Sequence, residues 1–365
     1  MQGGGEEVNT FGSAYRVCIF GSSHGPFVGA SAQGCPRGET ISEKAIQAEL
    51  DRRSPGKSPV STPRMERDKV DIISGLLDGR TTDAPIVGVV KNRDFDSSAY
   101  DAFVRVPRPG HADFTAACKY GGHSDHRGGG QFSGRMTVGL VFSGAVARQV
   151  LERRKVRLLA QTVQIGDVKL EKDVPFSAAE KLVRANAVGC ADRTVAEKMR
   201  DEIVRAHEDK DSVGGVVRCT VTGVPCGVGE PFFESVESKM SSMMFSIPGV
   251  KGVEFGSGFR SAAMRGSESN DPFAVKGGRI VTKTNNAGGI LGGIATGMPI
   301  EFRVAFKPTS SIARPQMSVD LRSKKSVELI VKGRHDPCIV PRAVPVVENS
   351  AACVVLDLML QGGFV

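Results

Sequence analysis

Short apolar runs of strand length alternate with amphipathic segments of helix length along the sequence, and this alternation limits the fold more than any other feature. The strand candidates are residues 15–20, 70–74, 86–90, 216–221, 252–255, 279–284 and 300–306. The longest helix candidates are residues 137–154, 194–207 and 344–360. Ser42 is placed to cap a further helix over residues 42–53, with Ile46 and Leu50 on one face. The sequence therefore predicts mixed α and β structure.

A single domain over residues 1–365 is the simplest interpretation of this pattern. The glycine-dense tract 119–134 lies between two strand-rich parts, but it is too short and too charged to link independent domains. With 365 residues, 40% of them hydrophobic, the chain can bury a large core. No internal repeat is visible. No uncharged run reaches the roughly 18 residues that would span a membrane, so we expect no membrane partner.

Cysteine usage and the N-terminal residues suggest a reducing compartment. The eight cysteines fall at irregular spacings without a Cys-x-x-Cys pair, which predicts neither a metal site nor a disulfide framework. The first residues, MQGGGEEVNTFG, lack the basic and apolar regions of an export signal and the pattern of an organelle signal. We therefore expect free thiols and a cytoplasmic protein.

The formal net charge of +8 is spread along the chain, which favours attraction of small anions over a basic arm for nucleic acid. Stacking groups for bases are scarce, since the chain has no Trp and only three Tyr. We therefore expect no nucleic-acid partner. A nucleic-acid-binding protein remains the alternative from another class, and it would retain RNA in a salt-sensitive way.

Five of the six histidines lie in short segments dense in glycine, arginine and aspartate, at residues 21–25, 108–113, 122–127 and 333–337. Glycine beside a histidine places backbone close to another group, and a neighbouring arginine suggests that this group is anionic. Distant segments would thus collect imidazoles and guanidiniums around one anionic ligand, as in an enzyme site. His207, on a charged helix end, is expected to be solvated.

Each of these segments also has a plainer interpretation. Residues 23–24 would place a hydroxyl and an imidazole at a ligand, or form an ordinary tight turn. Residues 108–111 form a stiff turn whose Arg and His would both face a phosphate or carboxylate. Residues 121–135 would offer backbone N–H groups to an anion, or form a flexible loop. Residues 288–294 would form a wall for a flat ring or pack in the core, and residues 307–311 would bind a phosphate or flavin edge or simply turn.

Taken in chain order, these segments resemble those of chorismate synthases, and the resemblance covers almost the whole chain. It rests on residues 9–12, 21–25, 51–53, 108–113, 119–121, 127–130, 223–225, 227–231, 287–293, 307–312, 333–338 and 341–345. No large insertion of the kind that would carry a flavin reductase is present. The resemblance therefore implies the monofunctional form.

The resemblance implies an α+β fold, a β-α-β sandwich with helices packed between two antiparallel sheets, assembled as a homotetramer. It implies a lyase of the shikimate pathway to aromatic amino acids. This enzyme would convert 5-enolpyruvylshikimate 3-phosphate to chorismate and phosphate by 1,4-anti elimination, with reduced FMN and no net redox change. NADPH is a candidate reductant of the flavin. An ordinary flavin oxidoreductase, the second enzyme alternative, would consume reductant at every turnover.

The resemblance also implies roles for individual residues. His24 would protonate the leaving phosphate with Ser23 as relay, and His111 would protonate or stabilise the reduced flavin near N1. Asp336 would act near flavin N5 in proton removal, and Ser133 would serve a proton relay. The residues implied to bind substrate are Arg53, Arg108, Arg135 and Arg334. Those implied to contact the flavin are Gln131, Phe132, Ser133, Pro248, Gly249, Gly292, Lys307, Pro308, Thr309, Ser310, Ser311 and Arg334.

The sequence departs from the usual pattern at three places. Ser22 replaces a glutamate of the first motif, and Gln131 and Phe132 replace an arginine and a serine of the glycine-rich motif. Pro248-Gly249 stands where the family usually has Asn-Ala. These changes are expected to alter flavin contacts and affinity more than the reaction.

Overall fold

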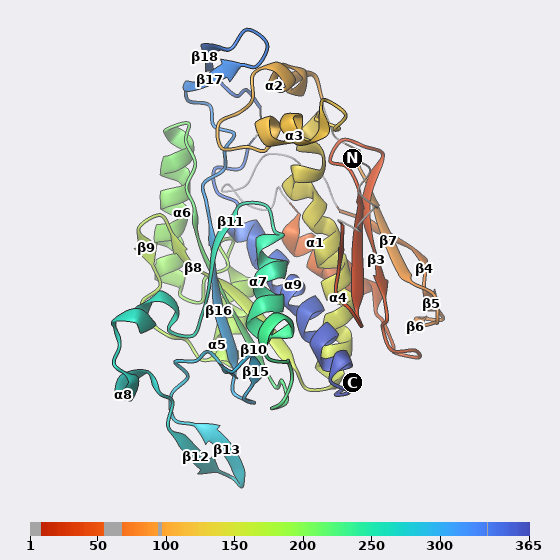
Figure 1. Ribbon diagram of the computed structural model, residues 1–365, viewed down its shortest axis with the longest axis vertical. Coiled ribbons are helices and arrows are strands. Elements are labelled where there is room, and N and C mark those ends of the chain that lie inside the picture. The colour runs from red at the N-terminus through yellow and green to blue at the C-terminus, as the bar shows by residue number, and fades with distance from the viewer. Residues whose placement is uncertain (1–8, 55–67, 94–96, 334) are drawn as a thin grey trace.

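Two five-stranded sheets enclose a layer of helices in the computed structural model, which describes residues 9–54, 68–93, 97–333 and 335–365 (Figure 1). The first sheet has the strand order β1-β2-β3-β7-β4 and the second β11-β16-β10-β8-β9, with antiparallel neighbours throughout. The predicted fold class is therefore confirmed. The strands of the first sheet are β1 (Thr10–Phe11), β2 (Arg16–Gly21), β3 (Phe27–Gln33), β4 (Val70–Ser74) and β7 (Ile86–Lys91). Those of the second are β8 (Arg157–Ile165), β9 (Val168–Lys169), β10 (Gly215–Thr222), β11 (Val250–Phe255) and β16 (Ile300–Phe306).

Helices α1, α4, α7 and α9 lie between the sheets, while α5 and α6 pack against β8 of the second sheet (Figure 1). The helix bounds are α1 (Glu43–Arg53), α2 (Asp101–Arg105), α3 (Asp113–Tyr120), α4 (Thr137–Arg153), α5 (Phe176–Ala185), α6 (Arg193–Glu208), α7 (Val236–Phe245), α8 (Gly266–Ser269) and α9 (Val340–Gln361). Short 3-10 segments are η1 (Ser98–Tyr100), η2 (Arg127–Phe132), η3 (Gly134–Met136), η4 (Phe232–Glu234) and η5 (Gly258–Ala263). Four hairpins complete the part of the chain that the structure describes: β5 (Leu76–Leu77) with β6 (Arg80–Thr81), β12 (Phe273–Lys276) with β13 (Arg279–Thr282), β14 (Ile290–Leu291) with β15 (Ile294–Ala295), and β17 (Gln316–Asp320) with β18 (Lys325–Leu329).

The two central helices, α4 and α9, are buried on nearly every side, as expected for helices enclosed by two sheets. They cross closely at Gly144, where an added Cβ would lie 2.1 Å from the carbonyl oxygen of Asn349. Helix α9 is long and apolar enough to span a membrane, yet its apolar stretch is buried inside the protein. Its Asp357 carboxylate accepts hydrogen bonds from the backbone N–H groups of residues 13–15. The long apolar helix is therefore part of the core, tied to the first sheet.

A buried ionic cluster joins three of the central helices. Glu348 of α9 is fully buried and pairs with Arg148 of α4 and with Arg52 of α1, and it accepts a hydrogen bond of 3.0 Å from the backbone N–H of Ala160. Burial by itself would raise the pKa of Glu348, but the two guanidiniums hold it well below its ordinary value. Because Arg52 precedes Arg53, this cluster also fixes the C-terminal end of α1, which reaches the candidate active site.

Candidate active site

Segments from both sheets and from the helical layer meet around a cavity of about 720 Å³. Among the predicted site residues, those lining it are Ser23, Arg53, Arg108, His111, Gln131, Phe132, Ser133, Arg135, Pro248, Gly249, Lys307, Pro308, Thr309, Ser310, Ser311 and Asp336. Gly292 lies at the tip of the β14–β15 hairpin and is not among the described lining residues. Arg334 lies outside the described residues. The structure thus brings most of the predicted site together from distant parts of the sequence.

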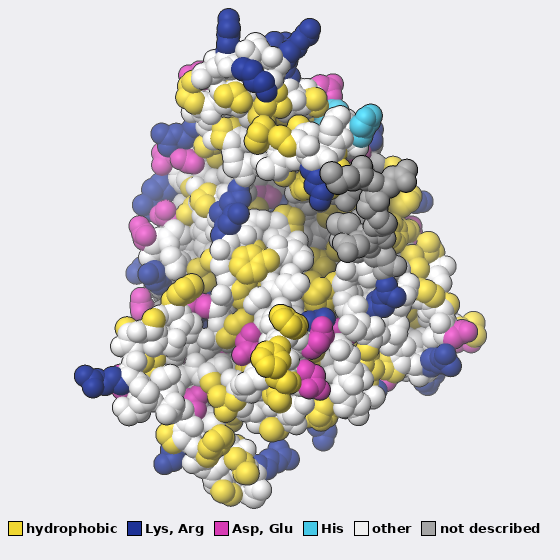
Figure 2. All heavy atoms as spheres, in the orientation of Figure 1, with side chains coloured by type: hydrophobic (Ala, Val, Ile, Leu, Met, Phe, Trp, Pro, Cys, Tyr) yellow, Lys and Arg dark blue, Asp and Glu magenta, His cyan; other side chains and the backbone are white. Residues whose placement is uncertain are grey.

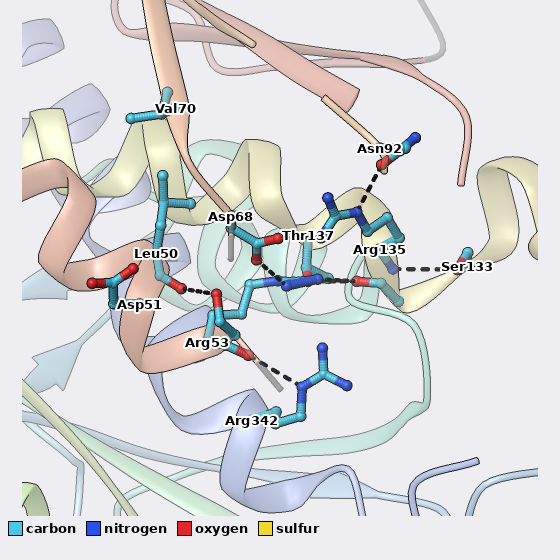
Figure 3. Close-up of polar contacts among 12 residues, drawn as sticks. Leu50, Asp51, Arg53, Asp68, Val70, Asn92, Ser133, Arg135, Thr137 and Arg342 are labelled. Atoms are coloured by element: carbon cyan, nitrogen blue, oxygen red, sulfur yellow. Dashed lines mark hydrogen bonds and ion pairs between the residues drawn. The ribbon is translucent and has the colours of Figure 1, made fainter. Parts of the chain in front are cut away.

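Three arginines and one buried carboxylate form one corner of the cavity (Figure 3). Arg53, at the last residue of α1, donates from Nη1 to Asp68 Oδ2 at 2.8 Å. Arg135 pairs with the other carboxylate oxygen of Asp68, and Arg342 donates from Nε to the backbone oxygen of Arg53 at 3.1 Å. Thr137, the first residue of α4, accepts from Arg53 Nε at 3.0 Å. Sequence reasoning missed Asp68 because it belongs to no recognisable motif.

The charges of this corner shift one another's pKa values. Burial lowers the pKa of Arg53 to about 10; Asp68 opposes this shift, while Arg342 and Arg135 add to it. Burial would raise the pKa of Asp68, but Arg53 and Arg135 hold it below its ordinary value. One carboxylate therefore faces two guanidiniums. The positive charge that is left over favours an anionic ligand.

His24 lies in the turn after β2, directly behind the cavity wall. Its side chain is buried, its Nδ1 lies 2.9 Å from Ser97 Oγ, and its ring packs edge-on against Tyr100. Gly128, in the left-handed region at φ +62°, covers the ring so closely that an added Cβ would come within 2.2 Å of it. His24 is not among the described lining residues, whereas Ser23 is. Ser23 and Gly128, the glycine that covers the ring, both line the cavity.

Asn92 connects the His24 turn to the arginine corner. Its Nδ2 donates to the backbone oxygens of Ser22 and Gly25 at 3.1 and 2.8 Å, and its Oδ1 accepts from Arg135 Nε at 3.0 Å. Ser22 itself donates to Asp125 at 3.0 Å. Ser22, which stands where the family usually has a glutamate, thus binds the Asp125 carboxylate, and neither residue is among the described lining residues of the cavity.

Another part of the cavity lining combines a turn at residues 108–111 with the loop after β16. Lys307 Nζ donates to the backbone oxygen of Gly110 at 2.6 Å and contacts Ser310 Oγ at 2.7 Å. Burial, then the nearby charge of Lys251, lower the pKa of Lys307. Thr309 Oγ1 donates to the backbone oxygen of Asp336 at 3.0 Å. These bonds fix the loop against the segments 108–113 and 333–337.

Asp336 is paired with Arg342, a residue of the first turn of α9 that also lines the cavity. Sequence reasoning placed Arg342 in a motif without giving it a role. Because the same guanidinium binds the backbone of Arg53, it couples the carboxylate to the arginine corner.

The cavity lining suits a large ligand that is both flat and anionic. Its apolar part includes Phe132, Phe245, Ile247, Pro248, Val250, Phe306, Ile339, Ala343 and Val346. Its cationic part consists of Arg53, Arg108, Arg135, Lys251, Lys307 and Arg342, and Asp336 is the acidic lining residue in the part of the chain that the structure describes. Gly129 lies close to His111, since an added Cβ would be in van der Waals contact with its Nε2 at 3.4 Å. An apolar wall with a polar, cationic rim fits a flavin ring and phosphate groups.

Two further features bear on other kinds of site. Within the described ranges, no three His, Cys, Asp or Glu side chains converge as metal ligands. All eight cysteines are free thiols. On the face in Figure 2, Lys and Arg side chains are scattered among acidic ones rather than gathered in one stripe.

The fold and the cavity define a protein with a largely cationic binding site for a small molecule. The model of the family described as chorismate synthase matches residues 15–360. The chain is 49% identical to the chorismate synthase of Korarchaeum cryptofilum over 96% of this chain and 97% of that protein. It is 48% identical to that of Methanocella arvoryzae, over 98% of this chain and 95% of the relative. A crystal structure of chorismate synthase superimposes with a TM-score of 0.75 at 26% identity, covering 96% and 93% of the two chains.

The chain belongs to the chorismate synthase family, and it is therefore a lyase of the shikimate pathway. The resemblance predicted from sequence motifs is confirmed.

Proposed function

We propose that the protein converts 5-enolpyruvylshikimate 3-phosphate to chorismate and phosphate by 1,4-anti elimination in the presence of reduced FMN. The observation that carries the proposal is one cavity lined by arginines from four segments together with Ser23, His111 and Asp336. The substrate has two carboxylates and a phosphate, so it needs several cationic partners in fixed places. The arginine corner and Lys307 supply them.

The residues present fit the flavin as a resident cofactor. The loop at residues 307–311, residues 131–133 and the apolar segment 247–250 would hold its ring and phosphate. Reduced FMN would supply electron density to the breaking C–O bond and regain it as the C–H bond breaks. NADPH is retained as a candidate reductant of the flavin.

The proton transfers would be divided between two sides of the cavity. His24 would deliver a proton through Ser23, which lines the cavity, to the leaving phosphate. Asp336 would take the proton from carbon, held in place by Arg342. His111 and Ser133 would hold protons near the flavin edge. General acids and bases in such positions contribute about 10²- to 10⁴-fold each.

We further propose a cytoplasmic homotetramer without nucleic-acid or membrane partners. Large apolar side chains exposed on the surface support subunit contacts, with Phe232 and Phe233 exposed to 83% and 89%. The mixed surface charge in Figure 2 gives no continuous track for a nucleic-acid backbone on that face. Light scattering should give the mass of four chains.

An anaerobic assay tests the proposed function. The protein is mixed with dithionite-reduced FMN and 5-enolpyruvylshikimate 3-phosphate, and chorismate is followed by absorbance. Chorismate should form with reduced FMN and not with oxidised FMN or with reduced FMN alone. Salt-sensitive retention of RNA without chorismate formation would favour the nucleic-acid alternative instead.

A further inference from the structure

Arg342, in the first turn of α9, holds two neighbouring groups of the site in place. Its Nη1 donates to the Asp336 carboxylate, and its Nε donates to the backbone oxygen of Arg53 at 3.1 Å (Figure 3). Because a guanidinium is planar and rigid, these two bonds fix the directions of all its N–H groups. Neither the sequence nor the family motifs gave this residue a role.

The third nitrogen of the guanidinium, Nη2, is available to the cavity. Among the described residues it has no hydrogen-bond partner, and it is not one of the buried polar atoms that lack a partner. The Arg342 side chain is 26% exposed and lines the cavity. Its Nη2 is therefore a donor that the protein holds in place before a ligand arrives.

The other arginines that line the cavity are less available. The side chains of Arg53, Arg108 and Arg135 are 2%, 4% and 11% exposed. Each guanidinium nitrogen of Arg53 and of Arg108 already has a partner within the protein. Among these four arginines, Arg342 thus has the most exposed side chain.

The charges next to Arg342 favour an oxyanion at Nη2. Asp336 balances Arg342 itself, whereas the single carboxylate of Asp68 faces both Arg53 and Arg135. These five side chains together keep a net positive charge. Carboxylate and phosphate are the partners that suit the guanidinium geometry best. An oxyanion at Nη2 would share one planar group with Asp336, which would fix the ligand relative to that carboxylate.

We propose that Arg342 binds an oxyanion of the ligand, a carboxylate or a phosphate, through Nη2 while its Nη1 holds Asp336. The identification of that ligand as the substrate rests on the proposed function, and the phosphate of the flavin is the other source of the same chemistry. In the rival explanation, Arg342 only holds Asp336 and the end of α1 in place.

Titration calorimetry on the full-length protein tests the contact without turnover. 5-enolpyruvylshikimate 3-phosphate is titrated in the presence of oxidised FMN, with which no elimination is expected. Arg342→Gln should weaken its binding by about 10- to 100-fold, the usual loss for a hydrogen bond to a charged group.

FMN and riboflavin, each titrated alone, distinguish the two sources. If Nη2 binds the substrate, Arg342→Gln should change the affinity for the substrate and not for FMN. If Nη2 binds the flavin phosphate, the affinity for FMN should fall, and that for riboflavin, which has no phosphate, should not. Either pattern supports an oxyanion contact. Equal losses for riboflavin and the other ligands would show a general disturbance of the cavity and overturn the proposal.

A double variant separates direct binding from the positioning of Asp336. In the Asp336→Asn protein, the Asp336 carboxylate is no longer there for Arg342 to hold or to balance. Adding Arg342→Gln should still weaken binding by about tenfold or more if Nη2 contacts the ligand. No additional loss would mean that Arg342 acts only through Asp336, which would refute the proposal.

The matched control is Arg200→Gln on α6. Arg200 also pairs with an aspartate, Asp201 at 3.0 Å, but these side chains are 53% and 60% exposed. The change removes the same charge from an arginine–carboxylate pair outside the described cavity lining. It should leave all three affinities unchanged, since solvent screens such a pair.

Unchanged affinity for substrate and FMN in a folded Arg342→Gln protein would overturn the proposal. If circular dichroism shows that this variant does not fold, Arg342→Lys decides, because one ammonium group cannot replace the planar guanidinium at both partners. About tenfold weaker binding to Arg342→Lys supports the proposal, and wild-type affinity refutes it. Loss of affinity in Arg342→Gln, with no chorismate formed by the wild-type protein, would refute the proposed function and leave this inference standing.

Discussion

Asp68 is the residue on which the arginine corner most depends. Its side chain is fully buried, and it is the carboxylate shared by Arg53, itself only 2% exposed, and Arg135. Asp68→Asn would leave two close guanidiniums without their counter-charge, and breaking a buried pair in this way costs about 3 to 5 kcal/mol. We expect the free energy of unfolding in urea to fall by that amount.

The control for this change is Asp71→Asn, three residues further along the chain at an exposed position of β4. It should alter stability by less than about 0.5 kcal/mol. Equal stabilities of the Asp68→Asn and Asp71→Asn proteins would show that the corner is not held by this carboxylate.

The two histidines should be separable by their effects. His24→Ala and His111→Ala are each expected to slow turnover by about 10²- to 10⁴-fold while the fold survives. His111→Ala should also change the absorbance spectrum of bound reduced FMN, whereas His24→Ala, behind Gly128, should not. Near-normal turnover of either variant, or a flavin spectrum altered by both, would contradict these assignments.

At the scale of elements, the glycine-rich segment η2 acts as a close-fitting cover for His24. Gly128→Ala would strain a backbone at φ +62° and place a methyl group 2.2 Å from the imidazole. The ring must move, so kcat should fall about as far as in His24→Ala, by 10²-fold or more.

Gly266→Ala is the control for this substitution, since no heavy atom lies within 4 Å of its added Cβ and its backbone has no positive φ. It should leave turnover unchanged. If the Gly128→Ala protein retained wild-type kcat, the close packing of η2 on His24 would not be needed for catalysis.

Many of the helices and strands could be predicted from the sequence, because the regular spacing of apolar residues indicates which side of an element is buried. The strands over residues 70–74 and 300–306 match β4 and β16, and Ser42 caps α1 through the backbone N–H of Ala45. Helix α9 begins four residues before the predicted start, because Pro341 fits the first turn of a helix. Strands β3 and β8 were missed. β3 is rich in Gly, Ala and Ser, residues that indicate a strand only weakly. Five consecutive residues of β8 are buried, so this strand lacks the alternation of apolar and polar residues that marks a half-buried strand.

The candidate site was predictable where a motif carries the side chain and not where a distant residue supports it. His24, His111 and Asp336 stand in glycine-rich or proline-rich turns that are visible in the sequence. Asp68 acts through contacts with Arg53 and Arg135, and spacing alone does not reveal which carboxylate a folded chain will bring to a guanidinium.

At the scale of the whole molecule, the ionic cluster at Glu348 couples the helical layer to the site. Its carboxylate has a lowered pKa, so it stabilises the protein above the ordinary glutamate range, and this stabilisation is lost as the pH falls through the lowered pKa. Glu348→Gln should lower the free energy of unfolding by about 3 kcal/mol or more at pH 7, with a smaller loss at pH 3. A constant difference between pH 7 and pH 3 would contradict the charge-based explanation.

The stoichiometry of the reaction tests the proposed elimination. With substrate in large excess over reduced FMN and no other reductant, we expect many molecules of chorismate for each flavin, equal amounts of phosphate, and flavin that remains reduced. One flavin oxidised for each molecule of product would contradict a redox-neutral elimination and identify a flavin oxidoreductase instead.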